Sequence, residues 1–223
     1  MSDYKVTSKI TLKNSETKVV IEDAKSELKD VRRKLGELQD TLYAHGKYAV
    51  LICIQGMDTA GKDSLIREVF KDFNARGVVV HSFKVPTELA LKHDYLWRHY
   101  IALPARGKFG VFNRTHYENV LVTRVHPEYV FSESIPTVKN LEDLNDDFYH
   151  SRMDRINQFE KHLEENGTVV LKFFLNLIDI HDIGTVVRLT RTQWPLSQYR
   201  KTIDNQIILT ACDENRSHLL WDN

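Results

Sequence analysis

The strongest constraint on this fold is an apolar run followed directly by a glycine-containing loop and a segment with helical spacing. Residues 48–54 are almost all apolar, as in a strand buried on both faces of a parallel sheet. The loop QGMDTAGKDSL then places Gly56, Gly61 and Lys62 at the G-x-x-x-x-G-K spacing of a phosphate-binding (Walker A) loop. In such loops, backbone N–H groups and the start of the next helix surround phosphate oxygens. The pattern therefore predicts a phosphate site, against the alternative of an ordinary turn with a surface lysine.

Two carboxylates make this loop unusual. Asp63 stands where the motif normally has Ser or Thr to hold magnesium, and Asp58 lies inside the loop. A carboxylate among phosphate-binding amides would repel the ligand unless a cation lay between them, and Mg²⁺ takes one or two carboxylates together with phosphates and waters. We therefore expect Asp58, with Asp63, to bind Mg²⁺. The alternatives are an ordinary turn residue at Asp58 and a favourable first-turn helix acid at Asp63.

The rest of the chain alternates predicted strands with predicted helices, which favours an α/β fold with a mostly parallel, doubly wound sheet. Residues 131–145 are polar and are predicted to form a loop. Further strands are expected at residues 78–83, 110–112, 169–175 and 207–209, and helices at residues 16–45, 63–74, 86–101 and 146–166.

The first of these helices is long and amphipathic. Its apolar residues recur at steps of three and four, and Ser15 and Gly46 are the expected N-cap and stop. Such a stripe packs on its own domain or dimerises, and both readings stay open. The stripe consists of Ala24, Leu28, Val31, Leu35, Leu38 and Leu42.

A second group of polar residues follows the strand predicted at residues 110–112. Asn113 and Arg114 come at its carboxyl end, which should face the phosphates. Asn113 stands where a Walker B aspartate is usual. Because asparagine is an uncharged and weak metal ligand, we expect the two loop acids, Asp58 and Asp63, to provide most of the metal binding. Further candidate donors to phosphate oxygens are Arg106, Lys108 and Arg124, with Lys84 weighed equally as a solvated surface residue.

Three further residues are predicted to have either a functional or a structural role. Tyr117 and Glu118 are candidates either for substrate contact or for a structural role. Lys172 lies inside an apolar strand, where an unpaired lysine would be costly, and so it should be paired or near the site.

The length, charge balance and cysteine content of the chain limit the classes of protein to which it can belong. The 223 residues suit one α/β domain with an appendage, and 31 basic residues balance 31 acidic ones, so no global field draws the chain to nucleic acid or membrane. The two cysteines, Cys53 and Cys212, form no disulfide framework, which favours a reducing compartment. The N-terminus lacks the apolar core of a signal peptide, and no stretch is long enough to span a bilayer. A cytoplasmic protein is expected.

Several ordered motifs resemble the second family of polyphosphate kinases. They are GMDTAGKD, SFKVPTE, HDYLWR, LPARGKFGVFNRTHYENVLVTRVHP and FEKHLEENGTVVLKFFL, and they span about residues 15–177. The resemblance implies a thymidylate-kinase-like P-loop fold of three α/β/α layers that moves phosphoryl groups between polyphosphate and nucleotides. The NRTHYE form, with Asn113, resembles the branch that phosphorylates AMP as well as ADP.

The resemblance also implies roles for particular residues. Asp58 and Lys62 would lie at the reaction centre, Asn113 and Arg114 would hold metal and phosphate, and Arg106 would line the polyphosphate path. Together with the loop pattern this gives a catalytic set of Asp58, Lys62 and Arg114 and a metal set of Asp58, Asp63 and Asn113. The remaining phosphate- and nucleotide-binding candidates are Gly56, Met57, Thr59, Ala60, Gly61, Lys84, Arg106, Tyr117, Glu118 and Arg124.

The expected organisation is an extension at residues 1–46, a kinase core at 47–177 and a divergent or truncated lid segment at 178–223, where Arg188, Arg191 and Arg200 would stand in for lid arginines. The leading hypothesis is a Mg²⁺-dependent, homo-oligomeric (dimeric or tetrameric) kinase using polyphosphate and AMP or ADP. The alternatives are an ATP-dependent kinase of a small metabolite and a non-catalytic polyphosphate- or nucleotide-binding protein with an incomplete lid.

Overall fold

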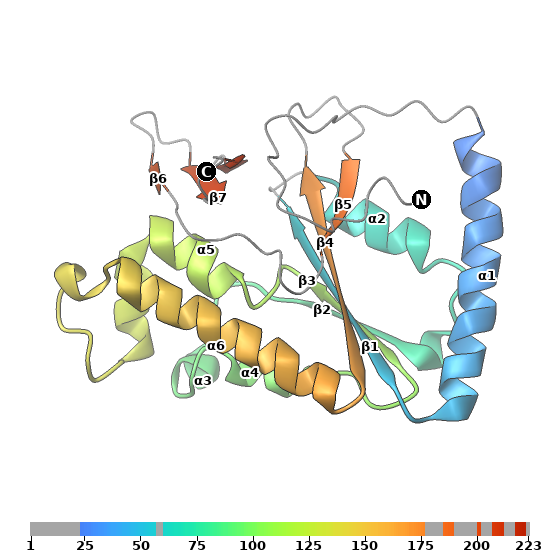
Figure 1. Cartoon of the computed structure of the whole chain (residues 1–223), viewed down its shortest axis with the longest axis horizontal. Helices are drawn as coiled ribbons and strands as arrows, with labels where there is room; N and C mark the ends of the chain where they lie inside the picture. The colour runs from blue at the N-terminus through green and yellow to red at the C-terminus, as the bar shows by residue number, and fades with distance from the viewer. Residues whose placement is uncertain are drawn as a thin grey trace.

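The computed structural model describes residues 23–56, 60–176, 185–189, 200–201, 207–211 and 217–221, with side chains described up to residue 175. A five-stranded sheet in the order β2-β3-β1-β4-β5 forms its centre (Figure 1). Four of these strands are parallel, and β5 (Thr185–Leu189) runs antiparallel to β4. The parallel strands are β1 (Ala49–Gly56), β2 (Val78–Ser82), β3 (Phe109–Asn113) and β4 (Thr168–Asn176).

The helices lie on both faces of this sheet. The long helices α1 (Ala24–His45) and α6 (Asp146–Glu165) are on opposite sides of it (Figure 1). The shorter helices are α2 (Lys62–Val69), α3 (Glu88–Leu91), α4 (Trp97–Tyr100) and α5 (Glu118–Val125), and the 3-10 turns are η2 (Ala75–Gly77), η3 (Pro127–Glu133) and η4 (Leu141–Asp143). A separate antiparallel sheet contains β6 (Arg200–Lys201), β7 (Ile207–Ala211) and β8 (Ser217–Trp221).

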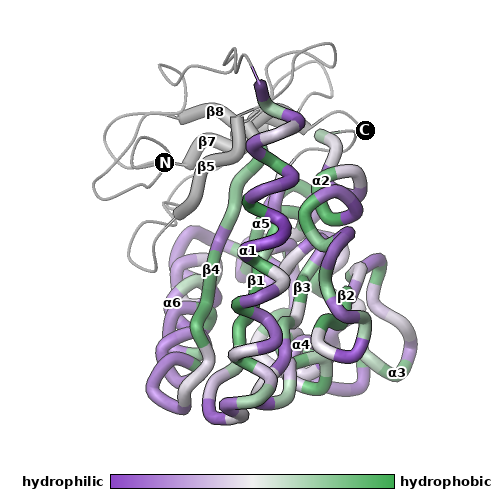
Figure 2. The backbone as a smooth tube through the Cα atoms, turned by 90° about the vertical axis from the view of Figure 1, so that its right-hand side faces the viewer, coloured by the Kyte–Doolittle hydropathy of each residue, from purple (hydrophilic) through white to green (hydrophobic). Residues whose placement is uncertain are grey.

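The alternation of side chains along β1 separates two apolar cores. Leu51 and Cys53 belong to the core shared with α5 and α6, whereas Ile52 and Ile54 belong to the core shared with α2. Figure 2 shows apolar residues concentrated along β1 and polar ones along the outer helices. The predicted α/β P-loop kinase fold, with a mostly parallel sheet and helices on both faces, is thus confirmed.

Several predicted boundaries are confirmed. Gly46 ends α1 in the left-handed conformation, with its N–H donating to Leu42, and Asn145 caps the start of α6. The strand predicted at residues 207–209 is present as β7. The predicted cap Ser15 and residues 16–22 of the first helix lie outside the described residues. Among the described helices, none combines the length and apolar content that crossing a bilayer requires.

Two predicted helices are shorter than expected. Residues 86–101 form two short helices, because the Asp94 carboxylate accepts from the N–H of Leu96 and starts a new turn. The helix after the loop ends at Val69 and not at Asn74. The chain then turns so that Phe73 packs edge-on against Phe109 of β3. The predicted loop at 131–145 contains the end of η3 and all of η4.

Candidate active site

The strand connections bring the loop and the Asn113–Arg114 pair to one edge of the sheet. From β1 the chain passes through α2 to β2, on the β3 side. From β3 it passes through α5 and α6 to β4, on the other side of β1. The neighbours β1 and β3 therefore send their connections in opposite directions, and ligands of such sheets bind outside the carboxyl ends at this point. Ile54 pairs with Asn113, the last residue of β3, and β1 continues only to Gly56, where the loop begins.

In the described part of the loop, the two glycines allow a close approach of β4 and a left-handed backbone conformation. A Cβ on Gly56 would lie 2.9 Å from Leu175 Cβ, so β4 can pass only if the side chain is absent. Gly61 adopts φ +76°, a conformation that favours glycine, and caps the start of α2. Lys62 is buried and its Nζ donates to the carbonyl of Gly56 at 2.9 Å, and Ala60 is buried beside it. Met57, Asp58 and Thr59 lie outside the described residues.

A hydrogen bond joins the start of α2 to the end of β3. Asn113 Nδ2 donates to Asp63 Oδ1 at 2.6 Å and also to Ser82 Oγ of β2 at 3.2 Å. The other amide atom, Oδ1, is buried and has no hydrogen-bond partner among the described residues. A carboxylate and an unsatisfied amide oxygen therefore lie close together at the edge where the phosphate loop begins its helix.

Arg114 and Lys84 follow the neighbouring strand ends. Arg114 is partly buried and adopts φ +58°. The N–H of Phe83 donates to the carbonyl of Asn113, so β2 and β3 remain paired up to this point, and the exposed Lys84 follows. The structure thus brings Lys62, Asp63, Asn113, Arg114 and Lys84 to one edge.

Arg98 is a further cation at this edge that the sequence reading missed. Its Nη1 donates to the carbonyl of Lys84 at 2.6 Å and its guanidinium lies 5.5 Å from the centre of the Phe83 ring. Burial lowers the pKa of Arg98, while the charges of Glu118 and Glu133 act in the opposite direction. The available signal was its position in the segment that follows the second strand, whose carboxyl end lies at this edge.

The turn after Arg114 is held by buried polar contacts. Thr115 Oγ1 donates to Gln55 Oε1 at 3.1 Å, and Gln55 Nε2 donates to Glu118 Oε1 at 2.8 Å. Tyr117 is fully buried and its hydroxyl donates to Glu160 Oε1 of α6 at 2.8 Å. Of the two roles left open for Tyr117 and Glu118, these contacts describe a structural one.

Lys172 is paired, as predicted. Its Nζ lies 2.8 Å from Glu160 Oε2 and donates to the Tyr117 hydroxyl at 3.2 Å. Burial alone would raise the pKa of Glu160, but the hydrogen bond from His116 and the charge of Lys172 hold this pKa at about 2. Burial also raises the pKa of the Cys53 thiol, with the charge of Glu160 adding to the effect. The thiol is therefore kept protonated.

Two of the candidate arginines, and Lys108, are not brought to this edge. Arg106 Nη1 donates to the carbonyl of Lys47, and Lys108 accepts from Val50, so both residues lie where β1 begins. The eight residues of β1 separate them from the loop, roughly 23 Å at the usual rise per residue. Arg124, in the last turn of α5, forms an ion pair with Asp146 and lies 5.0 Å from the centre of the Tyr149 ring.

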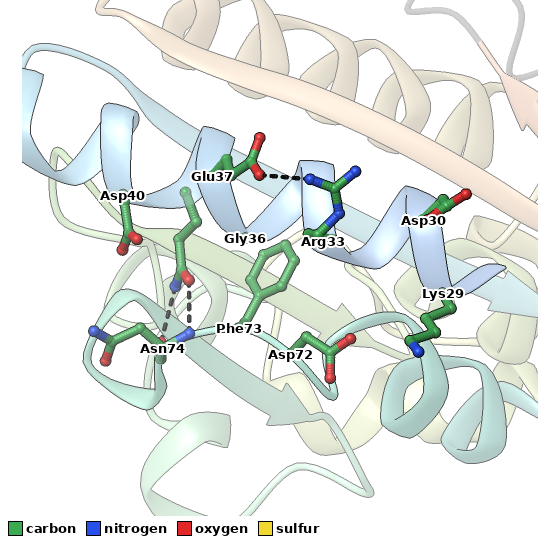
Figure 3. A pocket seen from close by; sticks show the side chains of 10 residues that line it. Lys29, Asp30, Arg33, Gly36, Glu37, Asp40, Asp72, Phe73 and Asn74 are labelled. Carbon is green, nitrogen blue, oxygen red and sulfur yellow. Dashed lines mark hydrogen bonds and ion pairs between the residues drawn. The ribbon is translucent and has the colours of Figure 1, made fainter. Parts of the chain in front are cut away.

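A groove of about 640 Å³ lies elsewhere, between α1 and the segment after α2 (Figure 3). Its charged residues have both signs, and Arg33 and Glu37 are paired across one turn of α1. A polyanion would meet no net positive field there. None of the predicted site residues lines it; the lining residues are Lys29, Asp30, Arg33, Gly36, Glu37, Gln39, Asp40, Asp72, Phe73 and Asn74.

The fold and the loop define the chain as a P-loop protein of the kinase type. A family model described as polyphosphate kinase 2 (PPK2) matches residues 18–207. The chain belongs to the polyphosphate kinase 2 family, and the match continues beyond Leu177, where the motif resemblance ended.

Individual relatives agree with this assignment. The chain is 48% identical over 144 residues to an ADP-polyphosphate phosphotransferase of Rhodopseudomonas palustris, covering 65% of this chain and 49% of the relative. It is 44% identical over 147 residues to an AMP/ADP-polyphosphate phosphotransferase of Meiothermus ruber, covering 66% and 49%. The crystal structure of polyphosphate kinase 2 from Arthrobacter aurescens TC1 superposes with a TM-score of 0.66 at 33% identity, over 78% of this chain and 60% of that one. The chain spans about half the length of the curated relatives that it matches.

Proposed function

We propose that this chain transfers a phosphoryl group from inorganic polyphosphate to AMP or ADP. The observation that carries the proposal is the meeting of Lys62 and Arg114 at one sheet edge, linked by the Asp63–Asn113 hydrogen bond. Relatives named ADP- and AMP/ADP-polyphosphate phosphotransferases support the choice of donor and acceptor. The acceptor is already an ionised phosphate, and so the reaction needs no strong general base.

Charge neutralisation and positioning would do most of the work in this reaction. Lys62, which begins α2, would act on the transferred phosphoryl group together with the backbone N–H groups of the loop. Arg114 would approach from the end of β3. Lys84, which follows β2, and Arg98 of α4, which donates to the Lys84 carbonyl, would bind the acceptor or the polyphosphate chain. Arg106 and Arg124 have no part in this proposal.

Magnesium fits the donors at this edge. The Asp63 carboxylate and the unsatisfied Oδ1 of Asn113 are oxygen ligands, and Mg²⁺ needs only one or two protein ligands beside phosphates and waters. The described residues contain no group of three His, Cys, Asp or Glu side chains that would form a complete metal cage. When bound, Mg²⁺ would neutralise the phosphate oxygens. Asp58 remains a predicted ligand and is proposed also to orient the attacking phosphate.

The test supplies AMP or ADP with polyphosphate and Mg²⁺ and measures the higher nucleotide by chromatography. We expect Lys62→Ala and Arg114→Ala to lower turnover by roughly 100-fold or more. Asp58→Ala should abolish transfer with the fold intact, and near-normal activity in that variant would overturn its assignment. Activity that survives EDTA would remove Mg²⁺ from the proposal.

The same assay separates the alternatives. Consumption of ATP, with polyphosphate left intact, would indicate an ATP-dependent kinase of a small metabolite. Binding of polyphosphate without turnover in a folded sample would indicate a non-catalytic binding protein. The proposed homo-oligomer, a dimer or tetramer, is tested by sedimentation of the same sample. The cytoplasmic location is tested by fractionation.

A further inference from the structure

The backbone at Arg114 is strained. Its φ of +58° lies in the left-handed region that residues with side chains rarely adopt, at a cost of about 1–3 kcal/mol. Such a conformation persists only where the surrounding structure over-determines it. The next four residues, Thr115 to Glu118, are all buried. The contacts of this turn therefore decide where the Arg114 guanidinium lies.

Glu160 of α6 is the centre of these contacts. Its Oε1 accepts from the Tyr117 hydroxyl at 2.8 Å and lies 3.1 Å from His116 Nε2, while its Oε2 lies 2.8 Å from Lys172 Nζ. Glu160 is 0% exposed and Lys172 is 1% exposed. One carboxylate thus joins two consecutive residues of the turn to β4, and Lys172 also donates to the same tyrosine hydroxyl.

A second set of hydrogen bonds links the turn to the strand that precedes the phosphate loop. Gln55 contacts both Thr115 and Glu118 through its side-chain amide, and it immediately precedes Gly56. The segment from Thr115 to Glu118 is therefore held at both ends by Gln55 of β1 and at its middle by α6 and β4. A change in the Glu160–Lys172 pair would shift Arg114 relative to Lys62, which donates to Gly56.

We propose that Glu160 and Lys172 are positioning residues for Arg114. The pair selects the one arrangement of the turn in which the arginine faces the transferred phosphoryl group. A buried ion pair adds little to stability compared with well-packed apolar residues of the same size, so the role that we assign to this pair is placement of the turn. The inference rests on the proposed phosphotransferase function.

The test compares two buried ion pairs that share α6. The double variant Lys172→Met/Glu160→Gln removes the proposed positioning pair. The matched control Arg152→Met/Glu133→Gln removes a pair, with side-chain exposures of 5% and 13%, that joins α6 to η3. Arg152 also donates to the Asn119 carbonyl, which follows the turn. We expect kcat to fall about 100-fold in the first, as for a small misplacement of a reacting group. KM for polyphosphate should stay within about threefold, and the control should keep wild-type kcat per folded molecule. Equal kcat losses in both would overturn the proposal.

A double-mutant cycle with Arg114→Ala gives a readout that a general loss of structure would not produce. If the pair acts through Arg114, then adding Lys172→Met/Glu160→Gln to the Arg114→Ala enzyme should lower kcat by less than about a further threefold. A combined loss of kcat equal to the product of the two separate losses would overturn the proposal. Should the double variant not fold, Tyr117→Phe removes the shared hydroxyl alone and should show the same coupling.

If the wild-type chain shows no transfer activity, then the proposed function is wrong. The positioning role can still be tested in that case by amide hydrogen exchange. Residues 114–118 should exchange faster in Lys172→Met/Glu160→Gln than in Arg152→Met/Glu133→Gln. Equal exchange of this turn in the two variants would overturn the positioning role by itself.

Discussion

Two long helices cover opposite faces of the same sheet and are attached to it in different ways. The 20 residues of α6 bury seven side chains, among them Ile156 at the centre of an apolar core and Glu160 beneath the Arg114 turn. Of the 22 residues of α1, only Gln39 is buried. One helix is thus part of the core and of the candidate site, whereas the other is docked from outside.

The attachment of α1 is mostly polar. Gln39 Nε2 donates to the Asn74 carbonyl at 2.8 Å, and its Oε1 accepts from the Asn74 N–H at 2.7 Å (Figure 3). Arg32 adds ion pairs to Glu68 and Asp72, while Leu38, a member of the predicted apolar stripe, is 60% exposed. Both helices have amphipathic sequences, so the stripe alone does not tell which helix supports the site.

The largest predicted effect comes from breaking the buried pair on α6. Glu160→Leu leaves the Lys172 ammonium buried without its carboxylate, and we expect it to lower the free energy of unfolding by about 3–5 kcal/mol. Urea denaturation measures the change. Lys172→Met/Glu160→Leu should recover most of the loss, because it leaves no uncompensated charge. A single variant as stable as wild type would contradict this account of the core.

Acid provides a second way to weaken the same contact. The pKa of Glu160 is lowered from 4.5 to about 2, so its ionised form is favoured by folding. This contribution is complete above about pH 4.5 and is lost as the pH falls towards 2, and a shift of this size corresponds to about 3 kcal/mol. The stability difference between wild type and Glu160→Gln should therefore narrow over this pH range. A constant difference would contradict the prediction.

Most features of the residues in the strands and at the strand ends could be predicted from the sequence. The loop and the meeting of Asn113 with it follow from which end of a strand each residue occupies, and the pairing of Lys172 follows from the cost of an unpaired charge inside an apolar strand. The same rule should have placed Arg106 and Lys108 at the opposite edge, since both precede the strand that Asn113 ends. The motif resemblance favoured Arg106 instead.

Other features could not be read in this way. Glu160 as the partner of Lys172 depends on how α6 turns its faces over β4, and a helical stripe does not fix that rotation. Arg98 reaches the site only because its helix starts anew after Asp94. Gln39 is a polar residue near the middle of an amphipathic helix, and its burial depends on the backbone of Asn74 across the interface.

A smaller effect is expected where α1 docks. A Cβ on Gly77 would lie 2.2 Å from Gln39 Nε2, so Gly77→Ala should displace the amide and cost about 1–3 kcal/mol through unsatisfied buried polar groups. In Gly77→Ala/Gln39→Ala the obstructed side chain is gone. The double variant should therefore cost less than the sum of the two single variants. Additive losses in urea denaturation would show that the contact between these residues does not fasten α1.

The smallest effect should come from the exposed face of α1. Arg33 and Glu37 form an ion pair across one helical turn, and both side chains are 65% exposed. Glu37→Ala should lower the free energy of unfolding by only about 0.3–0.5 kcal/mol, and less at high salt, because solvent screens the pair. Denaturation at low and high salt measures both quantities, with Glu37→Gln as a control that keeps the side-chain length. A loss as large as that of Gly77→Ala would mean that the charged groove, and not the buried amide of Gln39, holds α1 against the sheet.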